Sequence, residues 1–203
     1  MVGLISCEKH IILGSSSKVR QKILHEVGVD FDVVSPFYDE DKEKKKLKLS
    51  PKAMALYLAK QKALSVSEKF PKSYVIGSDQ VCEFEGKEFS KSKNAKEATS
   101  QLKAFNGKEH FQNNAVVIAF GGKIVFSNFS RVKMKMRKIS AKEIETYVLQ
   151  DQSWGCAGSY KYESLGKHLF EKVSGDYYSV LGMAIQPLLA FMHREKIIKI
   201  TNK

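Results

Sequence analysis

Short apolar runs alternate with amphipathic segments along the chain, and their periods predict a mixed α/β fold. Residues 11–13 are continuously apolar like a buried strand, and residues 18–27 then place apolar positions on one helical face. Ser16 or Ser17 can cap this helix, and Gly28 can end it. A strand, a hydroxyl-rich turn and a helix N-terminus form a natural anion site, but an ordinary serine-capped turn has the same pattern.

The same reasoning places the other elements. Alternating or continuous apolar runs predict strands, and a helical period behind a Ser, Asn or Pro start signal predicts helices. Lysines at 42–48 predict a mobile connector, and Gly121-Gly122 predicts a two-residue hairpin turn. The expected strands are residues 31–35, 74–82, 115–120, 123–126 and 130–139, and the expected helices are residues 51–70, 94–105, 140–149 and the segment opening at 186.

Length and composition narrow the class of protein. A chain of 203 residues can bury one substantial core, with room for two lobes around a cleft. No apolar run approaches the roughly 20 residues of a membrane helix, and residues 1–10 lack the basic and apolar regions of a signal peptide. Cys7, Cys82 and Cys156 form no zinc spacing and no plausible disulfide framework. We expect one cytoplasmic domain spanning residues 1–203.

The charge balance favours anionic partners. There are 34 Lys and Arg residues against 22 Asp and Glu residues, a formal net charge of +12. Nucleic acid and a phosphate-rich small molecule fit this charge equally well, and a solvated lysine-rich surface is the plainer interpretation. In the strand expected at 130–139, apolar residues face one side and Lys133, Lys135 and Arg137 the other, where they could rest on an RNA backbone or in water.

Two acidic positions are candidates for chemistry. The acidic turn at residues 38–41 follows a strand and could hold Mg²⁺, although a solvated loop is the more common outcome for such a cluster. Asp79 ends an apolar run between Ile76 and Val81, so it is unlike a free surface charge. A buried carboxylate there is a candidate metal ligand or general base, or it satisfies backbone groups at a strand end.

Taken together, these segments resemble the Maf family of nucleoside triphosphate pyrophosphatases from about Ile11 to His193. Each motif is weak alone, and their shared order carries the resemblance. In order they are Ser15 to Arg20, Asp39-Glu40, the Pro-led helix ending in Lys62-Ala63, Gly77-Ser78-Asp79-Gln80-Val81, Lys91, Tyr147, Ala157 to Tyr160, Gly175-Asp176 and Val180 to Gly182.

The resemblance implies a fold like that of inosine triphosphate pyrophosphatase, with a mixed, curved central sheet flanked by helices and a cleft between two lobes. It also implies a house-cleaning hydrolase that converts a nucleoside triphosphate to its monophosphate and pyrophosphate, with Mg²⁺ or Mn²⁺ as cofactor. A homodimer is what the family suggests. No membrane partner is expected, and nucleic acid is the less favoured partner.

The resemblance also implies roles for single residues. Glu40 and Asp79 would hold the metal, and Asp79 would orient or deprotonate the attacking water. Lys62 and Lys91 would act in catalysis by stabilising the charge that builds on the bridging oxygen. The residues that would cradle the triphosphate are Ser15, Ser17, Arg20, Lys62 and Lys91.

With Gln80 and Glu163 at these two positions, the chain resembles the family branch that hydrolyses 7-methyl-GTP. A carboxylate suits the cationic 7-methylguanine ring and its N–H donors, so both residues would lie at the base. Position 19 is associated with substrate choice in the family. Here it is Val19, which follows Lys18 and replaces the usual aromatic residue or arginine. Two further departures are Ser92, where proline is usual, and the altered segment 106–114.

Two other classes of function stay open. The net charge and the basic strand face fit a nucleic-acid-binding module, which would show steep salt dependence but lacks the interleaved exposed aromatics of a single-strand platform. A division-regulating protein without turnover is the other alternative that the family implies.

Overall fold

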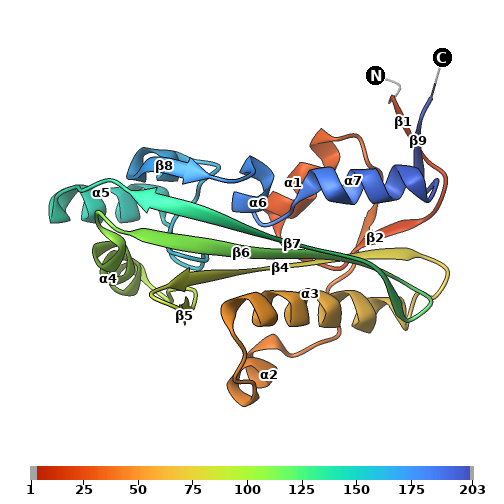
Figure 1. The fold of residues 1–203 in the computed structure, drawn as a ribbon, viewed down its shortest axis with the longest axis horizontal. Coiled ribbons are helices and arrows are strands. Elements are labelled where there is room, and N and C mark those ends of the chain that lie inside the picture. The colour runs from red at the N-terminus through yellow and green to blue at the C-terminus, as the bar shows by residue number, and fades with distance from the viewer. Residues whose placement is uncertain (1–3, 202–203) are drawn as a thin grey trace.

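A mixed sheet of seven strands runs through the computed structural model, which describes residues 4–201 (Figure 1). The strand order is β3-β2-β4-β6-β7-β8, and β5 pairs with β4. Strand β2 is parallel to both its neighbours, whereas the remaining pairs are antiparallel. The strands are β2 (Ile11–Leu13), β3 (Asp32–Val33), β4 (Tyr74–Phe84), β5 (Lys87–Phe89), β6 (Glu109–Phe120), β7 (Lys123–Met136) and β8 (Phe170–Ser174).

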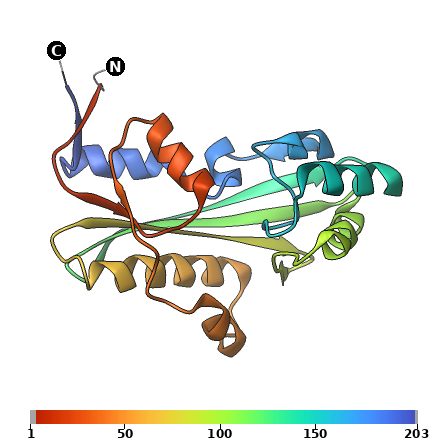
Figure 2. The ribbon, with the colours of Figure 1, turned by 180° about the vertical axis from the view of Figure 1, so that it is seen from behind.

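Helices cover both faces of this sheet, as Figures 1 and 2 show from opposite sides. Helix α3 lies along one face, α1, α6 and α7 lie along the other, and α4 and α5 gather at the end remote from the termini. The helices are α1 (Lys18–Glu26), α2 (Glu40–Lys46), α3 (Pro51–Ser67), α4 (Ala95–Phe105), α5 (Ala141–Asp151), α6 (Tyr177–Val180) and α7 (Ile185–Arg194), with a 3₁₀ turn at Leu165–Leu169.

The buried side chains form separate cores along the long strands. One core with Leu24 lies between the sheet and helices α1 and α7, and a second with Leu58 lies under α3. A third core, with Phe105 and Ile144, lies at the far end against α4 and α5. Strand β4 contributes to all three, and Asp79 lies between them. The expected mixed α/β fold, with a central mixed sheet flanked by helices, is therefore confirmed.

One close approach brings α3 against β4. A Cβ atom on Gly77 would lie 2.4 Å from the carbonyl oxygen of Ala59 and 2.8 Å from the backbone nitrogen of Ala63. Real Cβ contacts are never this short, so only glycine lets the helix pack so near the strand. The packing places Lys62, on the same helical turns, beside Asp79.

Several sequence predictions need correction. The expected connector at residues 42–48 is largely helix α2, because Asp39 Oδ1 accepts from the Lys42 amide at 3.0 Å and Lys44 pairs with Glu40 one turn away. The strands expected at 123–126 and 130–139 are one strand, β7, and the strand expected at 31–35 is only two residues long. The side chain of Asp41, part of the acidic turn, lies outside what the structure describes.

The chain ends pair in a way that the sequence did not predict. Strand β1 (Ile5–Cys7) pairs antiparallel with β9 (Ile198–Ile200), so the two ends of the described chain lie side by side. Both strands are three residues long, too short for a clear alternation pattern. Among residues 4–201, no helix combines the length and apolar character needed to cross a membrane.

Candidate active site

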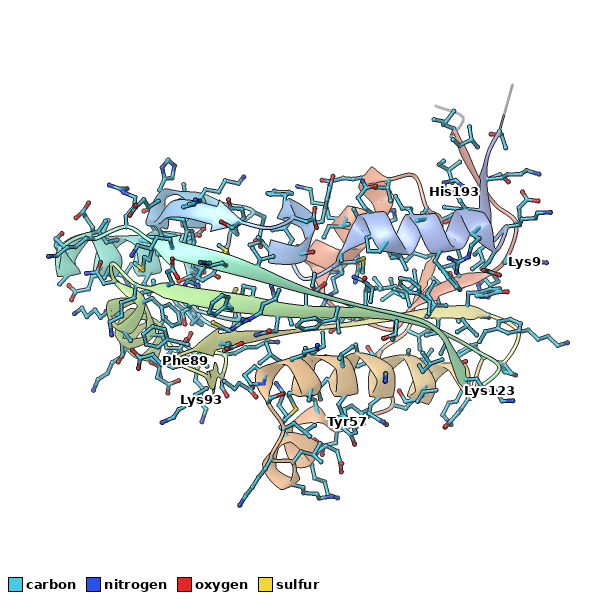
Figure 3. The ribbon with its side chains drawn as sticks, viewed as in Figure 1. Lys9, Tyr57, Phe89, Lys93, Lys123 and His193 are labelled. Carbon is cyan, nitrogen blue, oxygen red and sulfur yellow. The ribbon has the colours of Figure 1, made fainter. Side chains whose placement is uncertain are left out.

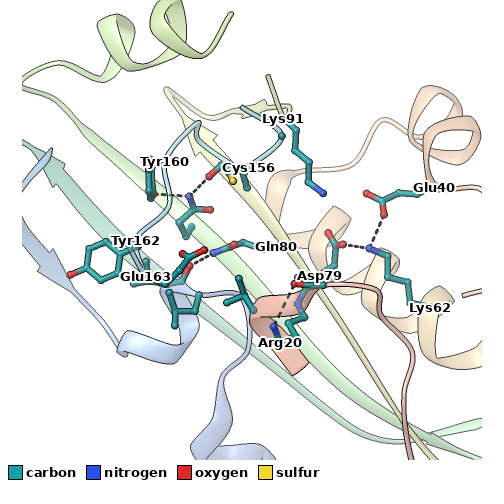
Figure 4. A pocket seen from close by; sticks show the side chains of 17 residues that line it. Arg20, Glu40, Lys62, Asp79, Gln80, Lys91, Cys156, Tyr160, Tyr162 and Glu163 are labelled. Atoms are coloured by element: carbon teal, nitrogen blue, oxygen red, sulfur yellow. Dashed lines mark hydrogen bonds and ion pairs between the residues drawn. The ribbon is translucent and has the colours of Figure 1, made fainter. Parts of the chain in front are cut away.

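Two adjoining cavities of about 190 and 360 Å³, here called the first and second cavity, open beside the middle of β4. All ten residues expected at the site line one cavity or both. Ser15 lines the second cavity only, and Val19, Asp79, Gln80 and Glu163 line the first only. The five that line both are Ser17, Arg20, Glu40, Lys62 and Lys91. Figure 4 shows that the side chains of Arg20, Glu40, Lys62 and Lys91 approach the same space from different elements.

The serine turn and its helix hold a guanidinium at the cavities. Ser17 caps α1 by accepting from the Arg20 amide at 3.5 Å. The Arg20 side chain donates from Nε to the Gly182 carbonyl at 3.0 Å and from Nη1 to Ser15 Oγ at 3.4 Å. Burial lowers the pKa of Arg20, and the nearby carboxylates of Asp79 and Glu40 oppose that shift. A guanidinium held in this way suits bidentate contact with a phosphate.

A lysine lies between the two expected metal-binding carboxylates. Lys62 Nζ is 2.7 Å from Glu40 Oε2 and forms a short ion pair with Asp79 Oδ1. Burial by itself would raise the pKa of Glu40, but the ammonium groups of Lys62 and Lys44 outweigh it and lower that pKa to about 2. Glu40 is therefore ionised at neutral pH.

The donor set at these carboxylates fits a hard divalent cation. Asp79 is only 4 % exposed, and its Oδ2 is buried with no hydrogen-bond partner among residues 4–201. No cluster of three or more His, Cys, Asp or Glu residues suited to a metal occurs in the described part of the chain. Mg²⁺ is commonly held by one or two carboxylates together with water and substrate phosphates, so Asp79 and Glu40 match that arrangement.

The segment around Gly182 positions side chains on one wall. Its carbonyl accepts from Arg20 Nε and, at 2.7 Å, from Ser78 Oγ. A Cβ on Gly182 would lie 3.3 Å from both Arg20 Nη2 and Gln80 Oε1, and its φ of +95° also favours glycine. Gln80 Nε2 in turn donates to the Val180 carbonyl at 2.8 Å. This wall is built from backbone carbonyls of a segment distant in sequence.

A loop held by α5 carries Glu163. The Tyr147 hydroxyl accepts from the Lys161 amide at 3.0 Å, and Lys161 Nζ donates to the Asp151 carbonyl at 2.7 Å. Ser164 Oγ also donates to Asp151 Oδ1 at 2.8 Å. These bonds lie on both sides of Glu163 in the chain and fix the loop against the helix.

Ser92, which stands where the family usually has proline, connects the segment of Lys91 to the loop that holds Gly155 and Ser159. Ser92 is buried, its carbonyl accepts from the Gly155 amide at 2.8 Å, and its Oγ lies 2.8 Å from Ser159 Oγ. Lys91 itself is exposed and lines both cavities. A proline carbonyl could accept from Gly155 equally well, so the serine in place of proline adds one hydrogen bond between two loops of the site, through its Oγ.

Sequence reasoning missed several residues of the first cavity, among them Gln112 and Tyr162. A signal for Gln112 exists in the chain, since the polar residues His110, Gln112 and Asn114 share one face of β6 and precede its apolar second half. All three side chains are buried on one side of β6. Buried polar side chains on one face of a strand indicate a constrained site instead of a solvated face.

The basic face of β7 makes contacts within the chain. Lys133 Nζ is 3.5 Å from Glu109 Oε2, and Lys135 Nζ donates to the Gly107 carbonyl at 3.0 Å. Arg137 Nη1 donates to the His168 carbonyl at 2.8 Å. Other lysines, such as Lys9, lie at separated places on the molecule in Figure 3. None of these contacts favours a nucleic-acid surface over a solvated one.

Comparison with known proteins identifies the class. The family described as Maf-like protein matches residues 10–195, and the chain belongs to this family. It is 37 % identical over 202 residues to a nucleoside triphosphate pyrophosphatase of Bradyrhizobium diazoefficiens, covering 98 % of this chain and 100 % of the relative. A protein of the same name from a Ruegeria species is 39 % identical over 197 residues, covering 94 % and 98 %.

A solved structure of the Staphylococcus aureus Ham1 protein aligns with 92 % of this chain and 100 % of its own, at a TM-score of 0.47 and 13 % identity. A likeness at this level supports no argument about function.

Proposed function

We propose that the protein is a nucleoside triphosphate pyrophosphatase, which releases pyrophosphate and leaves the nucleoside monophosphate in a house-cleaning role. The observation that carries the proposal is the convergence of cations and carboxylates on the first cavity. Arg20, Lys62 and Lys91 face the same space as Glu40 and Asp79. Membership of the Maf-like family and relatives named for this activity support the same conclusion.

The chain's own residues can bind and orient a triphosphate. Arg20 offers paired N–H donors, while Lys62 and Lys91 offer point charges. Ser15 and Ser17 add hydroxyls at the N-terminus of α1, where the free amides and the helix dipole also favour an anion. As the bridging oxygen gains negative charge, these cations stabilise the transition state more than the ground state.

In the proposed reaction, Asp79 acts on the attacking water. Its buried Oδ2 has no partner within the described chain, so it can accept a proton or a hydrogen bond from a water aimed at the α-phosphorus. Glu40 and Asp79 would hold Mg²⁺ or Mn²⁺. The ion, when bound, would neutralise phosphate charge and polarise the phosphoryl oxygens.

Replacing the proposed base tests this function. Asp79→Asn keeps the side-chain shape, so pyrophosphate release should fall by about 10²-fold or more while the fold stays intact. Asp32→Asn is the matched control, because Asp32 pairs with His10 at 2.8 Å and lines neither cavity. Near-normal turnover by Asp79→Asn would remove that residue from the mechanism. Absence of pyrophosphate release by the unmodified protein, with Mg²⁺ or Mn²⁺ and a full set of triphosphates, would refute the function.

For the substrate, we propose a modified nucleotide such as 7-methyl-GTP. Gln80 and Glu163 line the first cavity, and an ionised carboxylate complements a cationic base. Glu163→Gln removes the charge and keeps the size, so the preference should move from 7-methyl-GTP toward GTP. An unchanged ranking of the two substrates would contradict a contact between Glu163 and the base.

The homodimer and the cytoplasmic location stay predictions.

A further inference from the structure

Gln112 presents an unpaired acceptor at the wall of the first cavity. It lies within β6 at 1 % exposure, and its Nε2 is 2.6 Å from Tyr160 Oη and 3.1 Å from the Ala157 carbonyl oxygen. Its Oε1 is buried and has no hydrogen-bond partner among residues 4–201. Leaving a buried acceptor without a partner is unfavourable, so such an atom at a cavity wall calls for a donor from a ligand.

The surroundings determine which end of the amide is the acceptor. The Ala157 carbonyl can only accept, so the group facing it must be the NH₂ of Gln112. Tyr160 Oη accepts the second amide hydrogen, and it lies 3.0 Å from Nε2 of His110. Burial lowers the pKa of His110 to about 3, so at neutral pH the ring is uncharged and can accept the tyrosine proton. Both amide hydrogens are used, and Oε1 is left over.

Gln80 and Glu163 also present hydrogen-bond acceptors to the first cavity. Gln80 Nε2 donates to the carbonyls of Val180 at 2.8 Å and Ser179 at 3.4 Å, which leaves its Oε1 as an acceptor. Glu163 is acceptor-only when ionised. The cations Arg20 and Lys91 also line this cavity, and they suit the phosphates. The part of a ligand that meets the two glutamines and Glu163 therefore has to supply donors.

We propose that Gln112 is a specificity-determining residue, whose fixed Oε1 accepts a hydrogen bond from an amino group of the nucleobase. The substrates favoured are triphosphates of amino-bearing bases over counterparts that lack the amino group. This inference rests on the proposed function, because it assumes that a nucleotide occupies the cavity. It adds to the contact proposed for Glu163, because the uncharged amide of Gln112 responds to a hydrogen-bond donor on the base and not to the charge of the base.

Pairs of substrates that differ by one amino group test the inference. GTP is compared with ITP, and ATP with purine riboside triphosphate, by kcat/KM for pyrophosphate release. The unmodified protein should prefer the amino member of at least one pair by about tenfold, within the range expected when a buried acceptor is left unpaired. Gln112→Leu, of similar volume, should bring that ratio close to one, and Gln112→Met serves as a second variant.

Asn113→Leu is the control. Asn113 is the next residue of β6, is also buried, and its Oδ1 also has no partner among residues 4–201, but it lines neither cavity. Replacing the Asn113 amide can alter the stability of the protein and should leave the ratio of kcat/KM values within each substrate pair unchanged. Ratios within threefold in both pairs for the unmodified protein would overturn the inference, as would a preference that survives both Gln112 substitutions. If neither variant folds, the ratios of the unmodified protein decide. No pyrophosphate from any substrate would count against the proposed function itself.

Discussion

Gly77→Ala should damage both stability and turnover, because it separates α3 from β4. The added Cβ would lie 2.4 Å from the Ala59 carbonyl oxygen, whereas ordinary contact begins at 3.4 Å, so the helix has to retreat by about 1 Å. Overpacking of this kind costs about 1–3 kcal/mol, and we expect the upper end because the opposing atoms include rigid backbone. Lys62 moves with the helix, and a misplacement of about 1 Å can cost about 10²-fold in rate.

Urea unfolding measures the free energy of unfolding of the Gly77→Ala variant, and pyrophosphate release measures its kcat. Gly86→Ala is the control: Gly86 has a φ of +76° in the turn between β4 and β5, and among residues 4–201 no atom outside Gly86 and its chain neighbours lies within 4 Å of the added Cβ. It should lose about 1–2 kcal/mol to backbone strain and keep its turnover. If Gly77→Ala unfolds and turns over like the unmodified protein, the close approach does not position Lys62.

Two other predictions concern groups behind the site. The pKa of His110 is about 3 when folded and 6.5 when unfolded, so only the unfolded chain gains a proton between these values. The free energy of unfolding should therefore decrease as the pH falls below 6.5, by roughly 3 kcal/mol at pH 4.5. Urea unfolding of His110→Phe at pH 7 and 4.5 should show a decrease smaller by this amount, and a decrease equal to that of the unmodified protein would refute the account. Tyr147→Phe leaves the Lys161 amide without its acceptor, which should cost about 1 kcal/mol and raise KM more than kcat; an unchanged KM would contradict a positioning role.

Local signals in the chain were enough for most elements. Ser140 and Glu143 form the capping box that opens α5, and Asn94 caps α4, as their spacing indicates. Gly121-Gly122 turns β6 into β7. Where prediction failed, the deciding interactions were distant in sequence or the segment was short. The lysine-rich segment became α2, in which Lys44 pairs both with Glu40 and, 3.4 Å away, with Glu88 on β5.

The candidate site was predictable as a set of residues and not as a geometry. The Ser15 to Arg20 turn, the acidic pair after a strand and Asp79 at a buried strand all carry local patterns that indicate anion or metal chemistry. Their convergence on one space followed from the family resemblance, because nothing in their spacing relates them. Gln112 shows the limit: its strand pattern marks it as unusual, but only Tyr160 and Ala157 set the direction of its amide.

The sequence alone determined the strand and helix periods, the caps and turns, and the kinds of side chain available for binding phosphate and metal. Tertiary structure decided which of these meet. Lys62 reaches Asp79 because Gly77 lets a helix pack directly on a strand, and Arg20 is held by a carbonyl 162 residues away. Periods and caps depend on neighbours within a few residues, whereas the cavity depends on contacts between segments that only packing brings together.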